Sequence, residues 1–327
     1  MKTMSDLTYG SLFTGAGGFD LGFDQAGYDC RWQVEWNQHC QQVLQHRWPT
    51  VPKHHDIQDV SGSELEPVDV ITYGSPCQDL SIAGRRTGIE GNRSSMFFEA
   101  TRIFQEMRSG TNAAFPRIAI WENVPGALTS NSGNDFRTVL QTLDDIGALA
   151  QWWYVLDAQH FGIPQRRRRI FVISVFDPAI ADRIGSGDIL PVSARCQWDS
   201  RAHDNKKYRS SSKAAQRIDE SNAIAFNWAN GGGYGTANVG LGITIDGTGP
   251  LSTSQVPAVV HGDQPARKLT PIECERLMGW PDDHTLHRAD GKTTSNSHRY
   301  KMCGNGVASP VAQWIATNIT HLLTGEQ

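Results

Sequence analysis

Short apolar runs alternate with amphipathic stretches through the first half of this 327-residue chain. The runs that predict strands are residues 8–14, 28–35, 68–73, 117–122, 152–158 and 169–175. Helical spacing of apolar residues predicts helices after the first strand, over 37–48, over 95–108 and over 134–146. Such alternation is typical of a parallel sheet with helices on both faces, because each crossover returns the chain to the same edge. The sequence therefore predicts an α/β fold.

The composition changes after residue 185. Residues 186–262 are polar and rich in Gly, Ser and Asn, which favours a small, loop-rich, mostly β domain over more of the same sheet. We therefore expect a large domain over 1–185, completed by 296–327, with 263–295 as the connecting segment.

Helical patterns return near the C-terminus. In the stretch 269–280, Thr270 is expected to be the N-cap, with Pro271 at the first helical position and Glu273 close to capping-box geometry. A last helix is expected over 307–323.

Charge and cysteine content exclude several classes of protein. No apolar run reaches the roughly 20 residues of a membrane span, and no signal-peptide pattern begins the chain, so we expect a cytoplasmic protein without a membrane partner. The six cysteines form no Cys-x-x-Cys pair, which disfavours a structural zinc site, and no metal is expected. Most of them are expected to be small core residues.

The net charge is −4, but basic residues gather in two places. Residues 166–169 are four consecutive arginines, and 201–217 holds six Lys or Arg against one Asp. Such runs are often solvated surfaces, but they could also bind a polyanion such as a nucleic acid.

A glycine-rich turn follows the first expected strand, in the stretch FTGAGGFD at 13–20. Asp20 stands where a dinucleotide fingerprint needs its third glycine, so NAD is disfavoured. Glu35 ends the second strand, where a carboxylate can accept hydrogen bonds from ribose hydroxyls, and Trp36 could cover an adenine.

Three more polar or reactive residues follow later strands. Asp56 lies near the end of a weak third strand, and Glu122 ends the fifth. Pro76 should stop the fourth strand, which puts Cys77 in a loop just beyond it. Because ligands of open parallel sheets bind at the carboxyl ends of the strands, these positions predict one site.

The motifs that carry these residues occur in a distinctive order. They are SLFTGAGGFDLGF, VEWNQHC, HDI, GSPCQDLSIAG, RSSMFFEATRI, WENVPG, DAQHFGIPQRRRRIFVI, RKLTPIECERLMGWPD and YKMCGNGVASPVAQWIA. With this order the chain resembles the DNA (cytosine-5)-methyltransferase family over nearly its whole length. The resemblance implies a Rossmann-like, S-adenosylmethionine-dependent domain with a mostly parallel sheet, and a target recognition domain at 186–262.

The resemblance also implies the catalytic residues. Cys77 would add to C6 of a cytosine flipped out of duplex DNA, since C5 alone is a poor nucleophile. Glu122 would bind or protonate N3, with Asn123 and Arg167 positioning it and the base and Arg169 in the same network. C5 would then take the methyl group of S-adenosylmethionine.

Further sites follow from the same resemblance. The residues expected to bind the cofactor are Phe13, Gly15, Gly17, Glu35, Trp36, Asp56, Ile57, Pro76, Met96, Asn305 and Val307. The residues expected to contact DNA are Gln78, Ser81, Arg85, Arg86, Lys206, Lys207 and Arg209.

The chain departs from the family pattern at four positions, none of which removes a catalytic group. Ser11 replaces a commonly acidic residue, Met96 a leucine, and Gly306 a serine or alanine. Ala83 stands where some relatives carry a serine that fills the vacated base stack, which leaves the space-filling residue open.

Two other functions are weighed against DNA methylation. A tRNA cytosine-5 methyltransferase of the same architecture would carry the same catalytic motifs. A DNA-binding relative without activity should have lost Cys77 or Glu122, and both are present. The expected enzyme is a monomer from a bacterium or phage, with a restriction endonuclease for the same site as an optional partner.

Overall fold

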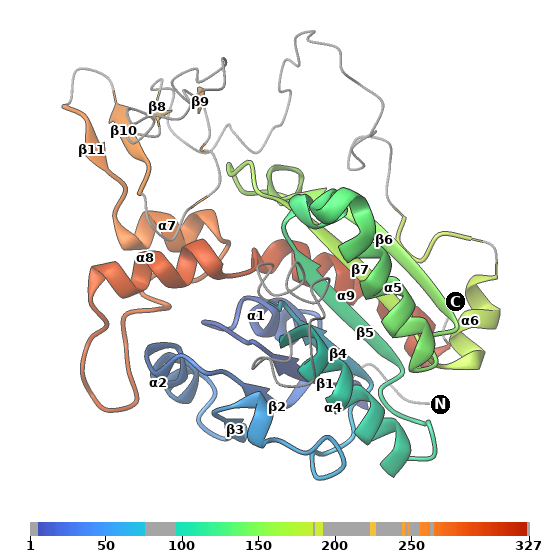
Figure 1. The fold of residues 1–327 in the computed structure, drawn as a ribbon. Helices are drawn as coiled ribbons and strands as arrows, with labels where there is room; N and C mark the ends of the chain where they lie inside the picture. The colour runs from blue at the N-terminus through green and yellow to red at the C-terminus, as the bar shows by residue number, and fades with distance from the viewer. Residues whose placement is uncertain are drawn as a thin grey trace, which may run out of the picture.

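The computed structural model describes residues 6–75, 96–185, 187–191, 223–226, 244–245, 248, 251, 256–261 and 265–325. Within them, seven strands form the main sheet in the order β3-β2-β1-β4-β5-β7-β6 (Figure 1). Their bounds are β1 Thr8–Leu12, β2 Asp29–Val34, β3 Lys53–His54, β4 Val70–Tyr73, β5 Ile118–Asn123, β6 Ala150–Asp157 and β7 Arg168–Val175. Each predicted strand is thus present, and the mostly parallel α/β fold is confirmed.

Strand β7 is the exception to the parallel sheet. It pairs antiparallel with both β5 and β6, because residues 158–167 form a short return that contains only a 3₁₀ helix (Ala158–Phe161). A parallel neighbour would need a crossover of about a dozen residues or more. Glu122 lies opposite Phe171 and Asn123 opposite Ile170, so β7 begins at the edge where β5 ends.

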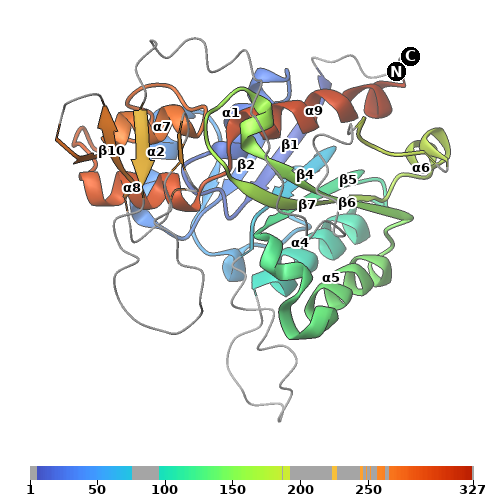
Figure 2. The same cartoon turned by 90° about the horizontal axis from the view of Figure 1, so that it is seen from above.

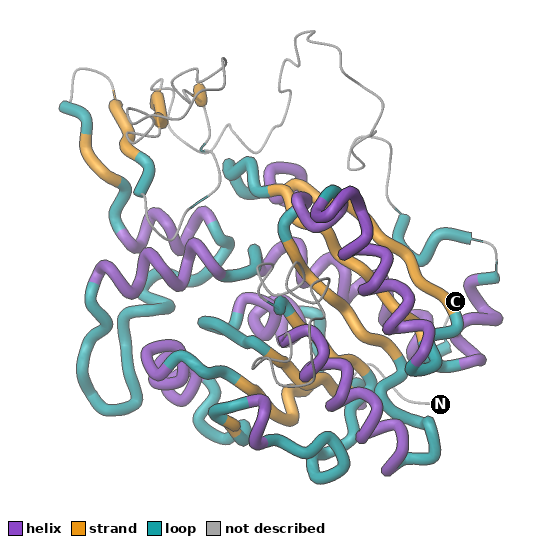
Figure 3. Tube along the Cα trace, in the orientation of Figure 1, coloured by secondary structure: helices purple, strands orange, loops and turns teal. Residues whose placement is uncertain are grey.

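Helices cover both faces of this sheet (Figures 2 and 3). Their bounds are α1 Gly18–Gln25, α2 Gln38–Arg47, α4 Met96–Gly110, α5 Asn134–Asp145, α6 Pro178–Ile184, α7 Pro271–Leu277, α8 Asn296–Asn305 and α9 Ser309–Thr324. Figure 2 shows α1 and α9 on one side of the strands and α4 and α5 on the other.

The core is split by the sheet into two clusters. On β5, Ile118 and Ile120 pack with α1 and α9, while Ala119 and Trp121 pack with α4 and α5. This follows from the alternation of side chains along a strand. The N-terminal helix α1 and the C-terminal helix α9 lie so close that a Cβ on Gly22 would be 2.6 Å from that of Ala312.

Two helices were not anticipated from the sequence. Helix α6 begins with a local signal, since Asp177 accepts a hydrogen bond from the Ala179 amide at 2.8 Å and Pro178 follows it. Helix α8 is mostly polar and lacks an apolar stripe, and it is anchored by the buried side chains of Arg299, Met302 and Cys303. The predicted capping box of α7, between Thr270 and Glu273, is present.

A second sheet lies beside α7 and α8. It has the order β11-β10-β8-β9, from β8 Ala223–Phe226, β9 Thr244–Ile245, β10 Ala258–His261 and β11 Arg267–Lys268. Its strands pair antiparallel.

The four cysteines within the described ranges, Cys30, Cys40, Cys274 and Cys303, are free and buried. For these four the expectation of core cysteines is confirmed.

Candidate active site at the carboxyl edge of the sheet

The predicted site residues gather where the parallel strands end. Phe13 and the glycines follow β1, Glu35 and Trp36 follow β2, and Asp56 follows β3. Glu122 and Asn123 are the last two residues of β5. Because these strands are parallel, one edge of the sheet carries all of them.

The glycine-rich loop after β1 has an unusual backbone. Phe13, Gly15 and Gly17 all have positive φ, of 55°, 61° and 86°. At Gly17 an added Cβ would also lie 2.5 Å from the ring of Trp48. Both the positive φ and the lack of space for a side chain therefore require glycine at this position. The Gly17 amide donates to the Thr14 carbonyl at 3.0 Å, which closes the loop as a tight turn into α1.

Glu35 fixes this loop from the second strand. One carboxylate oxygen accepts from the Gly15 amide at 2.7 Å and the other accepts from the Asn37 amide at 2.6 Å. Burial raises the pKa of Glu35, and the two amides partly counter that rise. Each carboxylate oxygen can accept one more hydrogen bond, such as one from a ribose hydroxyl.

An exposed aromatic ring lies next to this carboxylate. Trp36 is 68% exposed, and its ring meets His55 edge-on with 4.9 Å between centroids. Asp56 caps the short helix η2 (Ile57–Asp59) by accepting from the Gln58 amide, and Ile57 is buried below it. A wide, exposed aromatic ring is suited to stacking on a purine.

Residues from the C-terminal part of the chain complete this region. Val307 lies against the glycine-rich loop, since a Cβ on Gly18 would be 2.3 Å from its carbonyl oxygen. Asn305 is exposed at the end of α8. Elsewhere in the site, Met96, the first residue of α4, packs against the core cluster that lies between the sheet and helices α4 and α5.

Trp280 explains one departure from the family pattern. Its indole N–H donates to the Val307 carbonyl at 3.2 Å, and an added Cβ on Gly306 would be 2.5 Å from its ring. Glycine at 306 therefore accommodates this tryptophan. Sequence reasoning did not single out Trp280, because nothing local in its motif indicates a contact with residues 306–307.

A nearly buried ion pair lies at the end of β5. Arg169 Nε is 2.9 Å from Glu122 Oε1, and the other oxygen of Glu122 faces Gly74, where an added Cβ would lie 3.4 Å away. Burial raises the pKa of Glu122, while Arg169 and then Arg167 act in the opposite direction. Burial and the two arginines thus act in opposite directions on the protonation of this carboxyl group.

Arg167 has different hydrogen-bond partners. It is 2% exposed and donates to the carbonyls of Gly304, at 3.1 Å, and Gly306, at 2.6 Å. Burial lowers its pKa to about 9. Arg167 thus ties the end of α8 to the arginine motif, and the direct partner of Glu122 is Arg169.

Asn123 contacts the loop after β4. Its side-chain amide donates to the Ser75 carbonyl at 3.1 Å, and its oxygen accepts from the Val124 amide at 2.8 Å. The Trp121 indole donates to Ser75 Oγ at 2.9 Å. The end of β5 therefore anchors Ser75, which is two residues before Cys77 in the sequence.

Several predicted residues lie outside the described residues. They are Pro76, Cys77, Gln78, Ser81, Ala83, Arg85, Arg86, Lys206, Lys207 and Arg209.

No group of three or more His, Cys, Asp or Glu side chains in the described part of the chain could hold a metal ion. None of the helices described is both long and apolar enough to cross a bilayer.

Comparison with known proteins gives a consistent answer. The M.HhaI type II methyltransferase of Haemophilus parahaemolyticus is 28% identical, with 97% of this chain and 95% of the relative covered. The M.Bsp6I type II methyltransferase of Bacillus sp. (strain RFL6) is 30% identical, with 96% and 98% covered. The S. pombe Dnmt2 methyltransferase structure has the same fold, with a TM-score of 0.63 and 15% identity over 98% of this chain and 99% of that one.

The model of the C-5 cytosine-specific DNA methylase family matches residues 7–321, which is nearly all of the chain. Together with the glycine-rich loop, Glu35 and the Glu122–Arg169 pair at one sheet edge, this match shows that the chain belongs to the C-5 cytosine-specific DNA methylase family.

Proposed function

We infer that this chain is a DNA (cytosine-5)-methyltransferase that transfers the methyl group of S-adenosylmethionine to C5 of a cytosine. The observation that carries the mechanism is the ion pair between Glu122 and Arg169. It lies at the end of β5, next to the loop that leads from Ser75 into the Pro-Cys-Gln motif.

The residues around the glycine-rich loop fit S-adenosylmethionine. Glu35 retains acceptor capacity for ribose hydroxyls, Trp36 offers an exposed ring for the adenine, and the apolar side chain of Ile57 is proposed to contribute to the same site. Phe13, Gly15, Gly17, Asp56, Asn305 and Val307 line the same edge and are proposed to complete the site, with Met96 and Pro76 assigned from the sequence. When bound, S-adenosylmethionine supplies an electrophilic methyl group.

The protein's part of the reaction is to activate the ring. We assign Cys77 as the nucleophile: its thiolate forms a bond to C6, and the C5–C6 π electrons move toward C5. Glu122 hydrogen-bonds or protonates N3, which stabilises the enamine, and Arg169 holds its carboxylate in place. After C5 has gained the methyl group, loss of the C5 proton and of the Cys77 thiolate restores the aromatic ring.

The target base has to leave the duplex for this chemistry. We propose that residues 186–262 are the target recognition domain, and the antiparallel strands β8, β9 and β10 within that range support a separate β unit there. Gln78, Ser81, Arg85 and Arg86 would close over the DNA. Lys206, Lys207 and Arg209 would contact phosphates, so DNA affinity should fall steeply with salt.

The remaining proposals concern context. The enzyme would act as a monomer on duplex DNA in the cytoplasm, with a restriction endonuclease for the same site as a further partner. A tRNA cytosine-5 methyltransferase is the second candidate, and the Dnmt2 likeness, at 15% identity, supports only the fold.

The test compares the wild type with Cys77→Ala, using Cys274→Ala as the matched control because Cys274 is a buried thiol of α7. Cys77→Ala should abolish methyl transfer and keep S-adenosylmethionine and DNA binding, because the thiol acts only in the covalent step. A duplex with 5-fluorocytosine at the target should trap a covalent adduct on Cys77 in the wild type and in Cys274→Ala. Turnover by Cys77→Ala would disprove the assignment.

The substrate is tested separately. Bisulfite sequencing of DNA from a host that expresses the protein should show methylation in one sequence context. Methyl transfer to tRNA without transfer to duplex DNA would replace the proposed function by the second candidate.

A further inference from the structure

A histidine from the C-terminal part of the chain contacts the glycine-rich loop. His284 lies between α7 and α8 and is fully buried. Its Nε2 is 2.7 Å from the carbonyl oxygen of Ala16, a residue 268 positions earlier in the chain. Ala16 is itself fully buried and lies between Gly15 and Gly17.

The chemistry of this contact defines the state of the ring. A carbonyl oxygen only accepts hydrogen bonds, so Nε2 must carry the proton and donate. The other nitrogen, Nδ1, is buried and has no hydrogen-bond partner among the described residues. Burial lowers the pKa of His284 to about 4, so the ring is neutral at physiological pH and Nε2 is its only donor.

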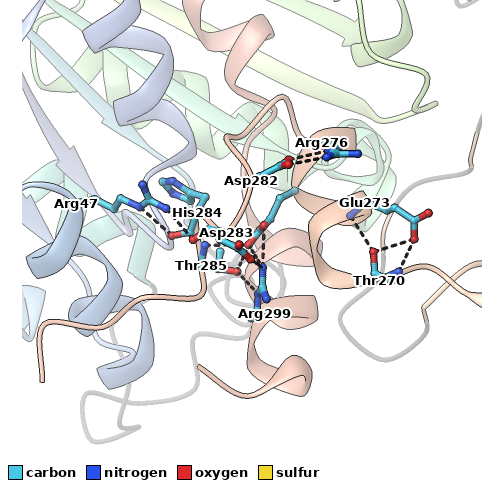
Figure 4. A network of polar contacts seen from close by, with 10 residues as sticks. Arg47, Thr270, Glu273, Arg276, Asp282, Asp283, His284, Thr285 and Arg299 are labelled. Carbon is cyan, nitrogen blue, oxygen red and sulfur yellow. Dashed lines mark hydrogen bonds and ion pairs between the residues drawn. The ribbon is translucent and has the colours of Figure 1, made fainter. Parts of the chain in front are cut away.

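The position of His284 is set by its neighbours. The ring packs against Trp280, with 5.2 Å between centroids, and Trp48, at 6.1 Å. Arg47 of α2 donates to the carbonyls of Asp283, at 2.7 Å, and His284, at 3.0 Å (Figure 4). The backbone and the ring of His284 are therefore both restrained.

A charged network holds the same short segment from the other side. Arg299 of α8 pairs with Asp283 at 3.0 Å (Figure 4). It also pairs with Glu275 of α7 at 2.9 Å, and Glu275 accepts from the Thr285 amide at 2.9 Å. Glu275 and Arg299 are 0% and 6% exposed. Polar groups this deep in the protein hold a rigid arrangement when all are paired.

The glycine-rich loop requires such a support. Three of its five residues from Phe13 to Gly17 have left-handed backbone conformations, which for Phe13 is an uncommon state. Glu35 accepts from the Gly15 amide on one side, and His284 donates to the Ala16 carbonyl on the other. Without that donor, the Ala16 carbonyl would be buried and unsatisfied, and the loop would favour other conformations.

We propose that His284 is a positioning residue for the S-adenosylmethionine site: it clamps the glycine-rich loop in its binding conformation opposite Glu35. The inference rests on the proposed function, since it assumes that the loop binds this cofactor. If only a fraction of molecules holds the loop correctly, the apparent dissociation constant rises by the inverse of that fraction. The effect should therefore fall on cofactor binding and leave the chemical step intact.

The experiment replaces His284 by phenylalanine, asparagine and glutamine. His284→Phe keeps a ring against Trp280 and Trp48 but has no hydrogen-bond donor. The side chain of His284→Asn is too short to place its amide nitrogen where Nε2 lies, so it cannot donate to the Ala16 carbonyl. His284→Gln can present an N–H close to that position. Titration calorimetry should show that the first two raise the dissociation constant of S-adenosylmethionine about tenfold, the equivalent of one lost hydrogen bond, and that glutamine restores it to within about threefold.

Kinetics provide a second readout that a purely structural role would not give. In His284→Phe the KM for S-adenosylmethionine should rise with kcat nearly unchanged, and the KM for DNA should stay at its wild-type value. His287→Phe is the matched control: His287 lies on the same segment and pairs with His46 of α2 at 5.5 Å, away from the glycine-rich loop. It should bind the cofactor like the wild type.

The outcomes separate this inference from the function on which it rests. A wild type that does not bind S-adenosylmethionine would refute the proposed cofactor. A wild type that binds, with His284→Phe and His284→Asn binding equally well, would overturn the clamp. Failure of both variants to fold, judged by circular dichroism melting, would make His284 a structural residue and would also overturn it.

Discussion

At the scale of single residues, the site depends on how burial and one cation set the state of Glu122. The carboxyl group is nearly buried, and burial raises its pKa, while Arg169 at 2.9 Å favours the ionised form. We propose that this balance lets Glu122 exchange a proton with cytosine N3. Four arginines stand in a row at 166–169, but only the geometry shows that Arg169 pairs with Glu122 and Arg167 with Gly304 and Gly306.

We predict that Glu122→Gln lowers kcat by about 10²- to 10⁴-fold, because an amide cannot act as a general acid. Binding of S-adenosylmethionine should not change, since Glu35 and Trp36 remain. Single-turnover methyl transfer and calorimetry measure the two effects. A variant with wild-type kcat would exclude a proton-transfer role for Glu122.

The pH dependence follows from the same pair. If the reaction needs protonated Glu122, activity falls as pH rises through its pKa. Arg169→Met removes a charge that lowers this pKa, so that fall should move to higher pH. Arg169→Lys keeps the positive charge, so the pH at which activity falls should shift less than in Arg169→Met. An unchanged profile, or a shift to lower pH, would contradict the role of the ion pair.

At the scale of elements, the direction of β7 places Arg169 beside Glu122. Were β7 parallel to β5, its first residues would lie at the far edge of the sheet, away from Glu122. Because it runs antiparallel, Arg168 and Arg169 begin at the edge where β5 ends. The turn from α8 into α9 also depends on a tertiary contact, because Gly306 packs directly on the ring of Trp280.

Gly306→Ala should lower the free energy of unfolding by about 1–3 kcal/mol, because the added methyl group would overlap the Trp280 ring at 2.5 Å. Combining it with Trp280→Phe, which removes the outer ring, should cost less than the sum of the two single changes. Gly110→Ala is the control, since its Cβ would meet only Ser63 at 3.6 Å, and it should not lower the free energy of unfolding. Urea unfolding gives all four values, and strict additivity would rule out the overlap.

At the scale of the whole molecule, segments from the N-terminal and C-terminal parts of the chain meet beside the site. Helix α9 packs on α1, and the segment between α7 and α8 reaches the glycine-rich loop through His284. The buried pair of Glu275 and Arg299 holds that segment, with Arg47 connecting it to α2 (Figure 4). Stability and cofactor binding are therefore expected to depend on the same network.

Arg299→Met should destabilise the protein by about 3–5 kcal/mol, because it leaves the carboxylate of Glu275 buried without a cation. The double change Glu275→Met with Arg299→Met should recover much of that loss. The control is Arg276→Met: Arg276 also belongs to α7, and its pair with Asp282, which follows the helix, is exposed, so its loss should cause no measurable change. Equal effects of Arg299→Met and Arg276→Met in urea unfolding would argue against a buried network.

The sequence by itself determined the local elements and the positions of the reactive residues. Apolar periodicity predicted the strands of the main sheet, and Glu35 and Glu122 were expected at strand ends, because strand length and side-chain alternation are encoded within a few residues. The tertiary structure decided the rest: the direction of β7, the pairing of Arg169 with Glu122, and the contact of His284 with Ala16. Alternating apolar residues look the same whichever way a strand runs, and a contact between residues 268 positions apart depends on how the whole chain packs.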